Sequence, residues 1–371
     1  MSKRGVQLQL DEEKKKNVEN EIELHVHLDG AIRTETIIET AKRRGIHFPW
    51  ETTEELKSHV VMTSPPYTLQ ALLDKFNTFM PVVAGDRDAI YKLAYDFCED
   101  SMLHNVYYVE GRYSPQLFAN KMTNGKKPPY ALTEGDITPR EVVSIICDAF
   151  EKGSKDFGII VKSILCCVVH EPNWSNEVVE LCKEFQSRGV VAIDITCGDL
   201  DPKIHNKELH TRAFQQASKL GIHRTVHAGE NGPAEGIKLA LDEMHAERIG
   251  HGYKVVDDPD LYERCRKENI HFEVCPISSV KLGSVSDDLD KHPLHRFIDD
   301  EVNFSISTDD PIVLDNNLTS DYEMVMEMGL DKDHVIATIF HAARSCFASP
   351  EEKEQILADL VKVYGEKYMK M

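Results

Sequence analysis

The chain alternates between short apolar runs and longer stretches in which apolar positions recur every three to four residues. The short runs are rich in β-branched residues, as expected of strands that are buried on both faces. Eight of them are predicted as strands, at residues 21–28, 106–112, 159–169, 190–196, 224–228, 248–252, 271–275 and 304–308. Helical periodicity separates them, most clearly at residues 141–152, 177–187, 210–220 and 236–245.

Strands that alternate with helices indicate βαβ units and therefore a parallel sheet. Eight such strands predict an α/β fold of the (β/α)8 TIM-barrel type, for which 371 residues is an ordinary length once insertions are included. A doubly wound open sheet is the alternative arrangement of the same pattern. Additional helices are predicted near the C-terminus, at residues 321–329, 332–346 and 350–367.

The connection after the first strand is much longer than an ordinary βα loop, since it covers residues 29–105. It contains an amphipathic helix at residues 68–80, which follows a Pro-Pro turn. Long insertions at the carboxyl end of a barrel often form lids over a site. The helix is therefore predicted either as a lid or as an extension of the core.

Charge and cysteine content restrict the class of protein. Acidic residues outnumber basic residues by 63 to 43, and a net charge of −20 argues against nucleic acid or an anionic membrane as a partner. The nine cysteines are odd in number and include no Cys-x-x-Cys, which favours a reducing, cytoplasmic location. Residues 1–20 are predicted as a charged arm before a single domain at 21–371, and no segment has the length and apolarity of a membrane span.

The segment His25-Val26-His27 is the first candidate for chemistry. Residues i and i+2 of a strand point to the same side, so both imidazoles could hold one metal ion. With 17 histidines in the chain, one His-x-His pair is unremarkable. The pair indicates a metal site only if other strands supply further ligands.

Other predicted strands do end in ionisable residues, and catalytic groups of a barrel come from the carboxyl ends of its strands. These residues are His25, His27 and Asp29 after the first strand, His227 and Glu230 after the fifth, His251 after the sixth, and Asp309 and Asp310 after the eighth. Ionisable groups are costly to bury unless they are paired or bound to a metal. The set therefore predicts a site at the barrel mouth.

Three imidazoles and one carboxylate are a suitable ligand set for zinc, with one position left for water. The candidate ligands are His25, His27, His227 and Asp309. Zinc can lower the pKa of a bound water to about 7. His251 could then act as a base toward that water or orient it. Glu230 could carry a proton on the substrate side, and Asp310 could accept or donate a hydrogen bond.

Other histidines are given different interpretations. The segment His271-Phe272-Glu273 matches His-x-Glu, but no Pro-Cys-x-x-Cys follows, so a zinc site of the cytidine-deaminase type is not supported. His223 is expected to be structural. Four histidines in polar connecting regions are expected at the surface, namely His205, His210, His292 and His295.

Six stretches together resemble the adenosine deaminase family. They are Glu-Leu-His-Val-His-Leu-Asp-Gly at 23–30, Arg-Tyr-Ser-Pro at 112–115, Ser-Ile-Leu-Cys-Cys at 163–167, His-Arg-Thr-Val-His-Ala-Gly-Glu at 223–230, Arg-Ile-Gly-His-Gly at 248–252, and Ser-Thr-Asp-Asp-Pro at 307–311. Their order and spacing are similar to those of the family from about residue 21 to the C-terminal helices. Several look closer to the animal cytosolic enzymes than to the secreted or nucleotide-acting relatives.

The resemblance implies a zinc-dependent barrel hydrolase of purine salvage, which converts adenosine and 2′-deoxyadenosine to their inosine forms and ammonia. It also implies a monomer with one Zn²⁺ per chain, bound by the four ligands named above. Glu230 would protonate N1 of the purine, and His251 would hold or deprotonate the attacking water. The resemblance places the substrate against Asp29 at the ribose, Asp310 at N7, Gly198 at N3, His27 beside the metal, and Leu69, Leu72, Leu73 and Phe76 of the predicted lid helix.

Two departures from the family pattern lie outside the zinc set. Residues 194–200 read Asp-Ile-Thr-Cys-Gly-Asp-Leu where the family usually reads Asp-Leu-Ala-Gly-Asp-Glu, so one extra residue precedes Gly198. Val169 stands where the family usually has Arg, so a local salt bridge is expected to be missing. We expect activity to survive both changes.

Two alternative functions remain open from the sequence. The first is a related aminohydrolase that acts on an adenine nucleotide or on adenine. The second is a zinc-containing barrel without catalysis that acts as a binding or signalling protein.

Overall fold

A computed structural model of the protein describes residues 20–63, 67–122, 126–204 and 206–370. Eight parallel strands form one sheet in which each strand pairs with the next in chain order. They are β1 (Glu21–His27), β2 (Val106–Tyr113), β3 (Ile160–Val168), β4 (Val190–Thr196), β5 (His223–Ala228), β6 (Arg248–His251), β7 (His271–Val274) and β8 (Phe304–Ile306). All eight predicted strands are present.

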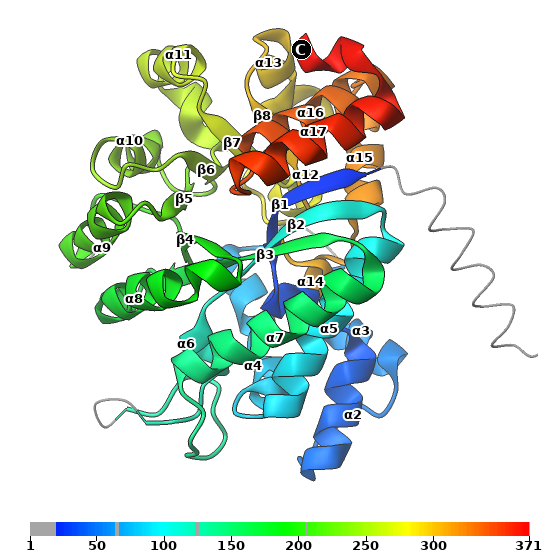
Figure 1. Ribbon diagram of the computed structural model, residues 1–371, viewed down its shortest axis with the longest axis vertical. Helices are drawn as coiled ribbons and strands as arrows, with labels where there is room; N and C mark the ends of the chain where they lie inside the picture. Colours follow the sequence, from blue (N-terminus) through cyan, green and yellow to red (C-terminus); the bar gives the residue numbers. More distant parts are fainter. Residues whose placement is uncertain (1–19, 64–66, 123–125, 205, 371) are drawn as a thin grey trace, which may run out of the picture.

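The first and last strands bring the two edges of the sheet together. Just beyond β8, Asp309 pairs with Val26 of β1 in parallel register. The N–H of His27 donates to the carbonyl of Asp309 over 2.8 Å, and the N–H of Asp309 donates to the carbonyl of His25 over 3.1 Å. The predicted (β/α)8 barrel is therefore confirmed, and the open sheet is excluded (Figure 1).

Helices surround the barrel (Figure 1). After β2 they are α6 (Pro115–Phe118), α7 (Pro139–Phe157), α8 (Ser175–Phe185), α9 (Lys207–Lys219), α10 (Ala234–Asp242), α11 (Pro259–Lys267), α12 (Pro276–Lys281), α13 (Leu294–Asp299), α14 (Pro311–Leu314), α15 (Leu318–Glu327), α16 (Lys332–Ser345) and α17 (Pro350–Tyr364). The predicted C-terminal helices are confirmed as α15, α16 and α17. Of these, α16 packs against β8 and β1, and α17 packs on α16.

Short 3-10 helices occur at several connections. They are η1 (Asp29–Ala31), η2 (Pro172–Trp174), η3 (Gln186–Arg188), η4 (Tyr253–Asp257), η5 (Leu289–Lys291) and η6 (Glu366–Lys370). Two of them, η1 and η4, directly follow the strands β1 and β6, whose ends carry candidate site residues. Each makes a tight turn of the chain close behind its strand.

Local signals determine where the longest outer helix begins and ends. The side chain of Thr138 accepts a hydrogen bond from the N–H of Glu141, and Pro139 occupies the first turn of α7. Gly158 ends the helix in a left-handed conformation with a φ of 71°. Between these ends, the apolar face of α7 packs against β3.

Four helices form the long connection between β1 and β2. They are α2 (Thr34–Arg44), α3 (Thr53–Val60), α4 (Leu69–Val83) and α5 (Arg87–Leu103). The predicted amphipathic helix corresponds to α4, which begins after Thr68, whose side chain accepts from the N–H of Ala71. Whether α4 moves as a lid stays a prediction.

The barrel interior contains charged side chains as well as apolar ones. Arg112 of β2, Arg248 of β6, and the carboxylates Glu110 and Glu273 of β2 and β7 are all at most 1 % exposed. Burial of such groups is tolerated only when opposite charges pair. The interior is thus built around ion pairs that lie below the barrel mouth.

Three further features concern the whole chain. Residues 1–19 of the predicted N-terminal arm lie outside the described residues. In the described ranges, no helix combines the length and apolarity needed to cross a membrane. All nine cysteines lie within these ranges, and each is a free thiol.

Candidate metal and active site

Four residues from three strand ends converge at the barrel mouth. His25 and His27 lie on β1, His227 lies on β5, and Asp309 follows β8. Each offers one ligand atom, and these atoms all lie within 4.8 Å of one another. His25, His227 and Asp309 are buried, and the side chain of His27 is 12 % exposed. The predicted ligand set is thus assembled in one place.

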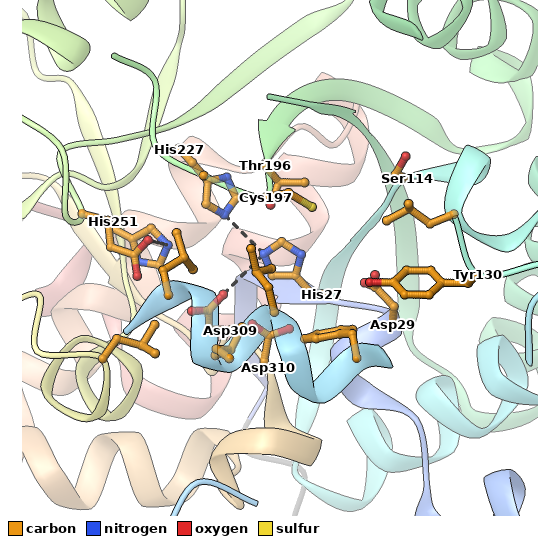
Figure 2. A pocket seen from close by; sticks show the side chains of 18 residues that line it. His27, Asp29, Ser114, Tyr130, Thr196, Cys197, His227, His251, Asp309 and Asp310 are labelled. Carbon is orange, nitrogen blue, oxygen red and sulfur yellow. Dashed lines mark hydrogen bonds and ion pairs between the residues drawn. The ribbon is translucent and has the colours of Figure 1, made fainter. Parts of the chain in front are cut away.

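The distances between these side chains suit a shared metal ion. The Nε2 atoms of His27 and His227 lie 3.2 Å apart, and the Nε2 atoms of His25 and His27 each lie 3.4 Å from Oδ1 of Asp309. Figure 2 shows His27, His227 and Asp309 pointing toward one another. The Nε2 of His25 is buried without a hydrogen-bond partner, which is costly unless a ligand is bound there. This donor set therefore fits a metal ion.

The protonation states of the candidate ligands suit metal binding. Burial lowers the pKa of His27 well below its usual value, so its imidazole is neutral and able to coordinate. Burial alone would raise the pKa of Asp309, but the adjacent imidazoles of His25 and His251 hold that pKa well below its usual range. Asp309 is therefore an anionic donor.

Three polar groups behind the candidate ligands determine their orientation. The Nδ1 of His25 donates to Oε2 of Glu273 over 2.7 Å, and the Nδ1 of His227 lies 2.9 Å from Oδ2 of Asp194. The hydroxyl of Ser278 donates to Oδ2 of Asp309 over 2.6 Å. A proton held on Nδ1 leaves Nε2 free to face the metal position.

Arg112 joins two of these outer groups. Its Nη1 contacts Asp194 over 2.7 Å, and its Nη2 contacts Glu273 over 2.6 Å. Burial alone would raise the pKa of Glu273, but Arg112 and Arg248 outweigh burial and hold that pKa well below its usual range. The carboxylate behind His25 therefore stays ionised and holds the imidazole in one orientation.

One pocket opens beside the candidate ligands. Every predicted site residue except His25 lines it, and the full lining is His27, Asp29, Leu69, Leu72, Leu73, Phe76, Ser114, Leu117, Tyr130, Thr196, Cys197, Gly198, His227, Glu230, His251, Leu282, Asp309 and Asp310. The space left between these side chains is only about 50 Å³. In Figure 2 the helix α4 crosses in front of the pocket. The four predicted residues of α4 therefore lie where a bound ligand would be covered.

Glu230 and His251 face this pocket from neighbouring strands. The Oε2 of Glu230 lies 3.9 Å from the Nε2 of His251. Burial, together with the nearby Asp199 and Asp309, raises the pKa of Glu230 well above its usual value. Burial also lowers the pKa of His251 well below its usual value. The pair can therefore present a protonated acid and a neutral base to the same space.

Several site residues have strained backbone conformations. His251, Asp309 and Cys197 have φ values of 62°, 72° and 62°, in the left-handed region that non-glycine residues rarely adopt. Such strain is found where a fold must aim a side chain in an unusual direction. Here it turns the ends of three strands toward the pocket.

Two further carboxyl groups line the same pocket. Asp29 and Asp310 are buried, and Oδ1 of each has no hydrogen-bond partner among the described residues. Burial raises the pKa of Asp29 to about 6. Burial and the neighbouring Asp309 raise the pKa of Asp310 well above its usual value. These groups have hydrogen-bonding capacity left for a polar ligand.

The altered segment after β4 turns at two residues that line the pocket. Cys197 and Gly198 have consecutive positive φ values of 62° and 143°. The carboxylate of Asp199 then accepts three backbone hydrogen bonds, from the N–H groups of residues 230, 231 and 232. The segment thereby anchors the loop that carries Glu230.

Two surface expectations for histidines are wrong. His210 is fully buried, with Nδ1 2.7 Å from the hydroxyl of Ser175 and Nε2 3.1 Å from the carbonyl of Val169. His292 is also buried and contacts the hydroxyl of Ser279. Polar partners on neighbouring elements compensate for burial of both rings. His295 is half-buried, and residue 205 lies outside the described residues.

His223 lies away from the candidate site, as expected. It begins β5, at the end of the strand opposite to His227. Its Nδ1 contacts Glu247 over 2.8 Å, and its ring stacks on Phe347. A structural role is in keeping with these contacts.

Sequence reasoning missed several residues that shape this site. Asp194, Ser278 and Glu273 contact candidate ligands, and Tyr130 lines the pocket. One signal could have revealed Glu273, because a carboxylate within an apolar strand needs a partner. No comparable signal marks Ser278, whose role depends on the path of the chain after β7.

Comparisons with known proteins agree with this geometry. The profile of the adenosine deaminase family matches residues 21–363. Adenosine deaminase of Danio rerio is 46 % identical over 346 residues, which cover 93 % of this chain and 95 % of that protein. Adenosine deaminase of Xenopus laevis is 46 % identical over 345 residues, with the same coverage. A solved adenine deaminase from Arthrobacter aurescens has a TM-score of 0.78 and 26 % identity, covering 92 % of this chain and 98 % of that chain.

Proposed function

This chain belongs to the adenosine deaminase family, and on that premise we propose that its barrel-mouth site hydrolyses adenosine to inosine and ammonia. The main support is the convergence of a candidate ligand set with Glu230 and His251 on one pocket. A barrel that only binds a ligand would not require a protonated acid and a neutral base side by side.

We propose zinc as the metal, held by His25, His27, His227 and Asp309. Three imidazoles and one carboxylate are a frequent zinc ligand set, and the partnerless Nε2 of His25 supports the fit. When bound, zinc supplies Lewis acidity that makes a water molecule nucleophilic near neutral pH.

Glu230 is proposed to protonate N1 of the purine ring. Its raised pKa makes it a carboxylic acid at neutral pH, and its Oε1 is buried without a partner. A proton at N1 withdraws electrons from C6 and makes that carbon easier to attack. The N–H groups that Asp199 holds in place keep the loop of Glu230 in position.

His251 is proposed to accept a proton from the attacking water. Its lowered pKa keeps the imidazole neutral, as a proton acceptor must be. Its Nε2 lies 3.9 Å from Oε2 of Glu230, so the proton acceptor and the proton donor would both face the same bound substrate. The site can therefore move protons at both the nucleophile and the ring.

Substrate positioning is proposed for the remaining pocket residues. A protonated Asp310 can donate to N7, and Asp29 can accept from a ribose hydroxyl. The N–H of Gly198 is assigned to N3, His27 adjoins the substrate, and the purine lies against Leu69, Leu72, Leu73 and Phe76. None of the chemistry at the purine uses the 2′-hydroxyl, so 2′-deoxyadenosine is proposed as a second substrate.

We also propose that α4 opens and closes over the pocket. A nucleoside does not fit into about 50 Å³, so its entry requires the apolar side chains of α4 to move. Such closure would exclude water from the reacting groups.

We propose that the protein is located in the cytoplasm. We also propose that residues 21–371 form one domain and that the protein acts as a monomer. Nine free thiols are in keeping with a reducing compartment. The net charge of −20 supports the absence of nucleic acid as a partner.

A direct assay tests the function and the metal together. Purified protein is expected to change the ultraviolet absorbance of adenosine with release of ammonia. Removal of the metal with a strong chelator should abolish this turnover, and added Zn²⁺ should restore it. Zinc-loaded protein that leaves adenosine unchanged would refute the proposal and favour a binding role.

A comparison of substrates separates the related activities. Among the described residues that line the pocket, four are Asp or Glu and none is Arg or Lys. A phosphate on the ribose would find no cation among these side chains and would meet the carboxylate of Asp29 as a like charge, which costs several kcal/mol. We expect the kcat/KM for AMP to be lower than that for adenosine by about a thousandfold. Faster ammonia release from AMP or adenine would assign the enzyme to one of those substrates instead.

The variant Gly30→Ala tests the position of Asp310. A Cβ at residue 30 would lie 2.0 Å from Oδ1 of Asp310, so that carboxyl group must shift. We expect kcat/KM for adenosine to fall by about a hundredfold, as for other misplaced groups. Gly45→Ala is the control, since nothing lies within 4 Å of its Cβ and its φ of 63° costs only backbone strain. Unchanged kcat/KM in Gly30→Ala would remove Asp310 from the proposed site.

A further inference from the structure

The pocket at the barrel mouth has a hydroxyl group in its wall that is free to bind a ligand. It belongs to Tyr130, a half-buried residue in the connection between α6 and α7. The hydroxyl has no hydrogen-bond partner among the described residues. A polar atom that faces a pocket without a partner in the protein is one of the groups by which such a pocket fixes the orientation of its ligand.

A tight turn determines where the ring of Tyr130 lies. The N–H of Ala131 donates to the carbonyl of Pro128 over 3.2 Å, so residues 128–131 form a hydrogen-bonded turn. The ring of Pro129 fixes φ at the first central position of this turn, and Tyr130 occupies the second. Pro128 and Ala131 are both buried, so each end of the turn is packed against the protein. A constrained segment therefore holds the phenol in the pocket wall.

Asp29 is the polar neighbour of Tyr130. It is 7 % exposed, and its Oδ1 is buried without a hydrogen-bond partner among the described residues. Figure 2 shows Tyr130 beside Asp29, with the phenol ring pointing into the pocket. Burial and the nearby Asp29 raise the pKa of Tyr130 above its usual value, so the phenol keeps its proton. A hydrogen-bond donor and a hydrogen-bond acceptor thus lie side by side, and neither is used by the protein.

These two groups define the ribose end of the pocket. In Figure 2, Asp29 and Tyr130 lie to the right of His27, whereas His227 and His251 lie to its left. The C6 atom of the purine belongs to the six-membered ring, and the ribose is attached to N9 of the five-membered ring. When C6 faces the metal position, the ribose therefore extends toward the end of the pocket that carries Asp29 and Tyr130.

The 5′-hydroxyl is the ribose group that suits this pair best. It is attached to a carbon outside the ring, so it reaches further from the purine than the 2′- or 3′-hydroxyl does. One hydroxyl group can donate a hydrogen bond and accept another at the same time. It can therefore donate to Asp29 while it accepts from Tyr130, and a single ligand atom would satisfy both polar groups of the wall.

We propose that Tyr130 is a specificity residue of this site, and that its hydroxyl donates to O5′ of a nucleoside whose 5′-hydroxyl donates to Asp29. The inference rests on the proposed deamination of adenosine and names the part of the substrate that the ribose end selects. A nucleoside without the 5′-hydroxyl leaves a buried acceptor unpaired, and is disfavoured for that reason.

The variant Tyr130→Phe tests this contact, because it removes the hydroxyl oxygen and keeps the aromatic ring. We expect kcat/KM for adenosine to fall roughly fivefold, as for loss of one neutral hydrogen bond, mainly through a higher KM. With 5′-deoxyadenosine, the variant and the wild type should have equal kcat/KM, since that substrate has no partner for the hydroxyl. Tyr91→Phe is the matched control, because Tyr91 is exposed on α5 outside the pocket.

Other deoxynucleosides identify the hydroxyl that Tyr130 meets. The loss in Tyr130→Phe should persist with 2′-deoxyadenosine and with 3′-deoxyadenosine. A loss that disappears with either of them would place the contact at that position and overturn the assignment to O5′. Equal kcat/KM of the variant and the wild type for adenosine would show that the hydroxyl makes no contact. An equal loss with adenosine and 5′-deoxyadenosine would assign the effect to packing of the ring, and both results overturn the proposal.

Binding of the reaction product separates this inference from the proposed function. Calorimetric titration of the metal-loaded full-length protein with inosine and 5′-deoxyinosine requires no turnover. Tyr130→Phe should bind inosine about fivefold more weakly than the wild type and bind 5′-deoxyinosine equally well. Wild-type turnover of adenosine without this difference would refute the role of Tyr130 alone. The expected difference in a protein that leaves adenosine unchanged would support the contact and refute the proposed deamination.

Discussion

Replacement of Glu230 by Gln is expected to reduce turnover of adenosine by about a thousandfold, within the range found for loss of a general acid. Glu230 is not one of the four candidate ligands, so the metal content should stay at that of the wild type. Glutamine has nearly the shape of glutamic acid but cannot give a proton to N1 of the purine. Single-turnover kinetics and metal analysis of the same sample measure both quantities.

The control for this variant is Glu235→Gln. Glu235 is exposed in the first turn of α10, a few residues after Glu230. It should keep wild-type turnover, which shows that loss of a carboxylate in this region is not itself harmful. Turnover by Glu230→Gln at the wild-type rate would eliminate Glu230 as the proton donor.

Glu273→Gln is expected to cost about 3–5 kcal/mol in the free energy of unfolding, as found when a buried ion pair loses one partner. All four groups around this carboxylate donate hydrogen bonds to it, namely Arg112, Arg248, His25 and Thr225. An amide nitrogen cannot accept any of them, and the charge between two arginines is lost. Urea unfolding with and without metal measures the change.

The same variant should also weaken metal binding, by roughly 10–100-fold, because His25 loses the group that holds its Nδ1 proton. The control is Glu268→Gln, which removes an exposed ion pair with Arg264. Such surface pairs contribute at most about 1 kcal/mol, and metal affinity should not change. If Glu273→Gln were as mild as this control, Glu273 would have no role in orienting His25.

The sequence predicted the fold because the barrel repeats one pattern eight times. Each strand reads as an apolar run, and each is followed by a helix, so errors of one or two residues at strand ends do not change the architecture. The prediction was weaker for isolated side chains. His210 looked like a surface residue in a polar region, but its two ring nitrogens find partners just after β3 and at the start of α8 that only the packed barrel brings near.

In the candidate site, too, some residues could be predicted from the sequence and others could not. Its inner residues could be named because strand order and the position of strand ends place His227 and Asp309 beside His25. The residues behind them could not, because their contacts join positions far apart in the chain, such as His25 and Glu273, which are separated by 248 residues. Nothing near either residue in the sequence records that pairing.

The sequence by itself determined the barrel, the location of its mouth, and the residue types able to bind a metal and move protons there. Only the tertiary structure decided which buried charges orient those residues, which backbone turns carry Cys197 and Gly198 into the pocket, and that a second cavity lies at the opposite end. The physical reason is the range of the interactions. Periodicity and strand ends are local properties of the chain, whereas ion pairs and cavities depend on the distances that packing sets between remote segments.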